Sequence, residues 1–138
     1  SKLSEGNFDD ARSELESAKS LLSQAESLEN SIKSILPEIQ NVRNQAQNAL
    51  NTYTGSRARD LASQARNRAE SAYQKAMNGD ISGAQSDINQ AKNLLNQAKV
   101  AEEEEARMRI LMMGVIALII IIAIVAVVFI MRRRKKTT

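Results

Sequence analysis

The residues of this chain that could do chemistry are its acids, its bases and its many serines. The 138 residues include no His and no Cys, so the serines lack an imidazole base and zinc lacks its usual ligands. No glycine-rich phosphate loop follows a strand pattern. Four successive acids, Glu102–Glu105, point in different directions around a helix and cannot converge on one calcium ion. We therefore expect a non-enzymatic protein with no metal, no other cofactor and no small-molecule substrate.

The distribution of charge argues against a nucleic-acid partner. The chain has 19 basic and 16 acidic residues, but five of the basic ones, Arg132–Lys136, lie next to the C-terminus. Residues 1–109 therefore hold fourteen basic residues against all sixteen acids, a net charge of −2. Such a region presents no basic surface for phosphate groups.

One stretch of the chain, residues 57–77, is nevertheless locally basic. Its basic residues are Arg57, Arg59, Arg66, Arg68 and Lys75. One interpretation is a surface for an anionic partner or a glycan. We favour the other, in which these side chains pair with acids of the preceding helix, which include Glu14, Glu26, Glu29 and Glu38.

The segment Ile110–Met131 differs from the rest of the chain. It has 22 consecutive residues without a charge, an amide side chain or a proline. As a helix it would span about 30 Å, the thickness of a bilayer's hydrocarbon core. A buried helix of a soluble domain is the alternative, but residues 1–109 offer only narrow, alanine-rich stripes that could not surround it. We expect a single transmembrane helix.

The basic run after this segment predicts its orientation. Arg132, Arg133, Arg134, Lys135 and Lys136 form a basic tail within residues 132–138 and are expected to contact anionic lipid headgroups. An excess of Lys and Arg marks the cytoplasmic side. We predict an extracytoplasmic N-terminal region and a cytoplasmic C-terminus. The opposed interpretation is a tail-anchored protein whose helices lie in the cytosol and recruit a soluble partner.

The elements that must hold these residues are long helices. Apolar residues recur at alternating steps of three and four, which predicts helices at about 8–53, 57–77 and 81–109, the last continuing through 110–131. The predicted fold is all-α: an antiparallel, coiled-coil-like bundle of long helices within residues 7–109 whose last helix becomes the transmembrane helix. Pro37 is expected to kink the first helix within one continuous rod, and the alternative is a true break at this residue.

Two local patterns mark the ends of this bundle. Gly6 and Asn7 predict a helix start, so residues 1–6 are interpreted as the end of an upstream segment. At the other end, i, i+4 pairs of Glu103 with Arg107 and of Glu105 with Arg109 predict an unbroken helix into the bilayer.

Residues 5–26 and 78–99 resemble each other. Nine of the 22 aligned residues are identical at a constant offset of 73, as in Ala11 and Ala84. Duplication and convergence of alanine-rich helices both explain this level of identity. Units of this kind bury their apolar stripes only against neighbouring units.

The N-terminal half of the first helix has no obvious partner within the chain, because the second helix is too short to reach it. Its apolar stripe consists of Phe8, Leu15, Leu21, Leu28 and Ile32. An exposed stripe of this extent is typical of an interface. Either an upstream domain continues the bundle or copies of the chain associate here, and we favour a homo-oligomer.

The layout as a whole, helices without Cys that lead into a C-terminal apolar span and the tail RRRKKTT, resembles the membrane-proximal stalk and anchor of archaeal cell-surface proteins, including the anchoring subunits of S-layers. The resemblance implies a structural role, in which the stalk holds a surface protein or assembly at a fixed height above the membrane. The last four residues, Lys135–Thr138, also resemble the dilysine retrieval signal of eukaryotic endoplasmic-reticulum membrane proteins.

Overall fold

The computed structural model describes residues 2–136, with side chains from residue 5 onward, and the secondary structure in this range is entirely α-helical. Helix α1 spans Lys2–Thr52, α2 spans Ser56–Met77 and α3 spans Ile81–Lys136. Short turns at 53–55 and 78–80 join them. The all-α prediction is confirmed, with three helices and no strand in residues 2–136.

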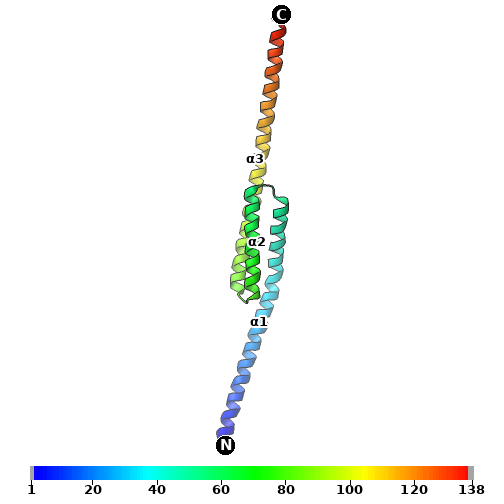
Figure 1. Ribbon diagram of the computed structural model, residues 1–138. Coiled ribbons are helices and arrows are strands. Elements are labelled where there is room, and N and C mark those ends of the chain that lie inside the picture. Colours follow the sequence, from blue (N-terminus) through cyan, green and yellow to red (C-terminus); the bar gives the residue numbers. More distant parts are fainter. Residues whose placement is uncertain (1, 137–138) are drawn as a thin grey trace.

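The three helices lie side by side only in the middle of an elongated molecule (Figure 1). Successive helices run in opposite directions there, and each contacts the other two. We call this region, residues 31–106, the packed segment, because burial begins and ends there. α1 extends from it toward the N-terminus and α3 extends from it in the opposite direction, so the termini lie at opposite ends (Figure 1).

Alanine dominates the core of the packed segment, as the stripes in the sequence predict. Small side chains let helices approach closely, but each buries little apolar surface. The larger buried side chains, Ile39, Val42 and Ile88, therefore supply much of the apolar contact. On α2 Ala62 is buried, whereas the neighbouring Leu61 is only half-buried. The buried face of α2 consists of Ala58, Ala62, Ala65, Ala69, Ala72 and Ala76.

The turn between α2 and α3 follows its sequence closely. Gly79 adopts φ +84°, a left-handed conformation that glycine tolerates best. The N–H of Asp80 donates to the carbonyl of Lys75 at 2.8 Å, which closes the end of α2. The Asp80 carboxylate then accepts the N–H of Gly83 at 2.9 Å and caps α3.

The predicted start of α1 is wrong. The helix begins at Lys2 rather than near residue 8, so residues 2–6 are helical and continuous with the rest of α1. Their interpretation as the end of an upstream segment stays a prediction. No atom outside its own helix lies within 4 Å of a Cβ built on Gly6. Without a neighbour to impose a turn, the helix continues through this glycine at a cost of about 1 kcal/mol.

The two questions about helix continuity are answered. α1 passes Pro37 without a break, and α3 runs unbroken from the packed segment into the apolar segment. α3 also extends beyond its predicted end at Met131, so most of the basic tail is helical. Ser1, Thr137 and Thr138, and with them the end of the dilysine-like motif, lie outside the described residues.

Candidate membrane anchor and adjoining surfaces

The apolar segment Ile110–Met131 projects from the packed segment on α3 and contacts no other helix. Each of its 22 residues is exposed. α3 is the one helix within residues 2–136 that is long and apolar enough to cross a membrane. A helix that is apolar on all sides and uncovered by its own chain requires an apolar environment from elsewhere.

The basic tail continues α3 beyond the apolar segment. Arg132–Lys136 are helical, and Arg133–Lys136 lie in the last turn of α3, where the helix dipole favours cations. The guanidinium of Arg133 lies over the ring of Phe129, 5.6 Å from the centroid. This contact links the tail to the last apolar turn.

At the other end of the apolar segment, Glu102 of α3 fastens the turn between α1 and α2. Its carboxylate accepts the backbone N–H of Gly55 at 2.9 Å and that of Thr54 at 3.2 Å. The Thr54 hydroxyl also donates to it, at 3.1 Å. These hydrogen bonds, first of all that from Gly55, hold the pKa of Glu102 below its ordinary value.

Arg109 completes this junction with a partner that the sequence pattern does not predict. Its guanidinium pairs with Glu102 at 3.3 Å and donates to the Thr54 hydroxyl. The predicted Glu105–Arg109 pair is therefore replaced by a Glu102–Arg109 pair, because Glu102 already lies against the turn. The carboxyl group of Glu105 instead lies against Gly55, where it would clash with an added Cβ. The predicted Glu103–Arg107 ion pair does not form either; both side chains are exposed.

A buried carboxylate joins α2 and α3 farther from the apolar segment. Asp87 is 2% exposed, and its carboxylate accepts a hydrogen bond from the Ser71 hydroxyl at 2.6 Å. Lys75 pairs with it at 2.9 Å and Arg68 at 3.6 Å. Burial raises the pKa of Asp87, but the hydrogen bonds from Ser71 and Lys75 and the two positive charges outweigh burial and lower it overall.

These contacts explain part of the basic character of α2. Arg68 and Lys75 pair within the chain, as expected, but their partner is Asp87 of α3 and not an acid of α1. On the first helix, Glu38 pairs with Lys92 of α3. The sequence pattern does not single out Asp87, although Asp87 directly precedes Ile88 in the buried stripe.

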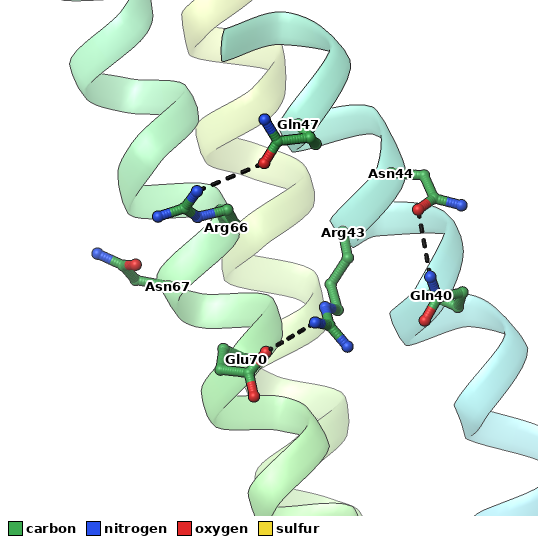
Figure 2. A pocket seen from close by; sticks show the side chains of 7 residues that line it. All are labelled: Gln40, Arg43, Asn44, Gln47, Arg66, Asn67 and Glu70. Atoms are coloured by element: carbon green, nitrogen blue, oxygen red, sulfur yellow. Dashed lines mark hydrogen bonds and ion pairs between the residues drawn. The ribbon is translucent and has the colours of Figure 1, made fainter. Parts of the chain in front are cut away.

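A groove of about 450 Å³ lies between α1 and α2 on the surface of the packed segment. Figure 2 shows two pairs of side chains that meet across the groove and a third pair, Gln40 and Asn44, that lies along α1. Arg43 pairs with Glu70 at 3.3 Å, and Arg66 donates to Gln47 at 3.4 Å. The charged groups of the groove are thus satisfied by its own walls, and they do not converge on a point where a ligand would react.

The N-terminal half of α1 leaves its apolar stripe uncovered, as expected from the short second helix. Phe8, Leu15 and Leu21 are 80%, 57% and 65% exposed. The stripe is covered only near the packed segment, where Ile32 is half-buried and Leu28 lies against Gly79. The exposed part is therefore shorter than the predicted Phe8–Ile32 stripe. Self-association through it stays a prediction.

Comparisons of the chain with protein-family models, with curated proteins and with solved structures found no match. Within residues 2–136 no cluster of carboxylates is arranged to hold a metal ion.

Proposed function

We propose that this chain is a non-enzymatic membrane anchor and helical stalk. The observation that carries the proposal is the exposed apolar segment Ile110–Met131. This segment belongs to α3, the same unbroken helix that packs against α1 and α2 in the packed segment. A bilayer provides the apolar environment that this segment lacks within the chain. The partners are then the lipid bilayer and a protein domain attached to, or bound by, the N-terminal part.

The proposed stalk role follows from how α3 joins the packed segment to the apolar segment. The three helices form an antiparallel, coiled-coil-like bundle, and the hydrogen bonds of Glu102 fix the first turn of this bundle on α3. Glu102 precedes Ile110 by eight residues, or about 12 Å of helix. The bundle would therefore stand directly on the membrane surface, without a flexible linker. From there α1 extends about 40 Å beyond the packed segment.

The basic tail supports an orientation with the bundle outside and the C-terminus inside. Five consecutive basic residues follow the span, and each contributes about 1 kcal/mol of attraction to an anionic leaflet. In this orientation the stalk holds a cell-surface protein or assembly at a fixed distance from the membrane. This is the role of the S-layer-type anchors that the layout resembles.

Labelling of single cysteines tests both insertion and orientation, because the chain has no native Cys. One variant carries Ser13→Cys on the exposed part of α1, and the other carries a cysteine appended after Thr138. In intact cells a membrane-impermeant maleimide should label the first and spare the second, and carbonate washing should leave the protein in the membrane. Each membrane-centre substitution by Arg costs about 3 kcal/mol of insertion, so Ile119→Arg with Ile121→Arg should release the chain.

The reverse labelling pattern would identify the chain as a tail-anchored cytosolic adaptor. Recovery of the unaltered chain in the soluble fraction would exclude both functions.

A further inference from the structure

The two similar segments, residues 5–26 and 78–99, have opposite environments in the structure. The second begins α3 and lies in the packed segment, where Ala84, Ile88 and Ala91 are fully buried. The first lies in the N-terminal part of α1, and each residue from 5 to 26 is exposed. With the offset of 73, the buried residues of α3 correspond one by one to exposed residues of α1, which are Ala11, Leu15, Ala18 and Ala25 for Ala84, Ile88, Ala91 and Ala98.

The correspondence extends to a charged position. Asp87, which is buried against Ser71, Lys75 and Arg68 of α2, corresponds to Glu14. Glu14 is exposed and forms no ion pair within the described residues. The face of α1 thus carries an acid at the place where the equivalent face of α3 receives two basic side chains.

The carboxylate that fastens the first turn also has an equivalent. Glu102, which accepts the backbone N–H groups of Thr54 and Gly55, corresponds to Glu29 of α1. Glu29 pairs with Lys33 of its own helix at 2.8 Å and with no other of the described residues. The two carboxylates through which α3 contacts α2 and the turn before it, Asp87 and Glu102, therefore each have an acidic equivalent on α1.

The exposed face of α1 is also continuous with an existing interface. Toward the C-terminus it leads into Ile35, Ile39 and Val42, which are buried in the packed segment. Leu28 lies at the boundary, 3.3 Å from a Cβ built on Gly79. Figure 1 shows that the N-terminal part of α1 lies apart from α2 and α3. This length of α1 leaves room for a second packed unit, one end of which would lie against Leu28 and Gly79.

We propose that the exposed face of α1, residues 8–29, is a docking site for a helix of the α2 type. That helix carries alanines at alternating steps of three and four and a basic side chain opposite Glu14. The chain's own α2 is not available, because its alanine face is buried between α1 and α3. The partner is thus another unit of this architecture, and α1 is the helix shared between the two units. This inference does not depend on the membrane anchor.

A designed extension of the full chain tests the proposal. Because Gly79 corresponds to Gly6, a second copy of residues 31–79 placed directly before residue 7 supplies an α1–α2 pair in register with the exposed face. Amide hydrogen exchange over residues 8–25 should slow by about tenfold or more in the extended chain. Leu15→Asp and Glu14→Lys should each remove this protection, although both substitutions leave the stability of the original chain unchanged.

The matched control is the same extension with Ala69→Asp and Ala72→Asp in the added copy, which should give no protection. Unchanged exchange over residues 8–25 in the extended chain, with the original packed segment still protected, would overturn the proposal. So would a dimer of the original chain that Leu15→Asp dissociates, because the occupant of the face would then be a second copy of α1.

Discussion

Asp87 and Lys75 form the most deeply buried ion pair among the described residues, with 2.9 Å between the carboxylate and the ammonium group. The carboxylate is almost completely buried, whereas the Lys75 side chain is 41% exposed. Ser71 also donates to the carboxylate, and Arg68 faces its other oxygen at 3.6 Å, so these contacts favour one register of α2 against α3.

Asp87→Asn should destabilise the packed segment by about 1.5–3 kcal/mol, the range for hydrogen bonds to charged groups. The pKa of Asp87 is lowered in the folded state, so this stabilisation is present above about pH 4 and disappears as the pH falls further. Thermal unfolding in detergent micelles can be followed by circular dichroism. The thermal midpoint of Asp87→Asn should lie well below that of the unaltered chain at pH 7, and this difference in midpoint should vanish toward pH 2. A pH-independent difference would contradict the ionic origin.

Ile88→Ala and Leu15→Ala compare equivalent positions of the two similar segments. Ile88 is fully buried, so its truncation should cost about 2–5 kcal/mol. Leu15 is 57% exposed, so its truncation should change stability by less than about 0.5 kcal/mol. Urea unfolding of both variants measures the difference. Equal losses of stability would show that the face of α1 is covered by a second chain under the conditions used.

The helices could be predicted well from the sequence where local pattern and packing agree. α2 and the start of α3 match within one residue, because Gly55, Gly79 and Asp80 interrupt apolar stripes that are buried on both sides. The start of α1 could not be predicted, because Gly6 and Asn7 are a boundary signal of about 1 kcal/mol with no packing to enforce it.

The side-chain partners were less predictable than the helices. Local i, i+4 spacing suggested Glu103 and Glu105 as ion-pair partners, whereas the structure uses Glu102, which binds a turn 47 residues away. Asp87 could not be predicted for a similar reason. Its partners lie on α2, and which residues of α2 face Asp87 depends on the packing orientation of the two helices. A polar residue directly beside an alanine stripe is the one signal in the sequence that could have drawn attention to Asp87.

Glu102→Ala should loosen the turn between α1 and α2, whereas Glu105→Ala should not. Only Glu102 accepts the N–H groups of Thr54 and Gly55, and Arg109 would lose its partner as well. The expected result is faster amide exchange at Thr54, Gly55 and the first turn of α2 in the Glu102 variant alone. Equal acceleration in both variants would indicate a general effect of negative charge near the start of α2.

Neutralising basic residues of the tail should lower the fraction of chains that insert with the C-terminus inside. With Arg132, Arg134 and Lys136 replaced by Gln, the excess of basic residues after the span falls, and a larger fraction of chains should insert with the C-terminus outside. The labelling assay with the appended cysteine measures this fraction. Lys99→Gln with Arg107→Gln is the matched control, since it removes basic residues from the other side and should make the orientation more uniform.

Pro37→Ala should stabilise α1 by about 1–3 kcal/mol. Pro37 is exposed and lies within the helix, so its replacement removes no buried contact and restores the N–H that donates to the carbonyl of Lys33. The gain should appear as a higher thermal midpoint, and Ser34→Ala, an exposed change in the same turn, should give only a few tenths of a kcal/mol. Pro37 lies between Ile35 and Ile39, both buried against the other helices. If the alanine variant is less stable than the original chain, the packing of these two residues requires the backbone geometry that proline favours at this position.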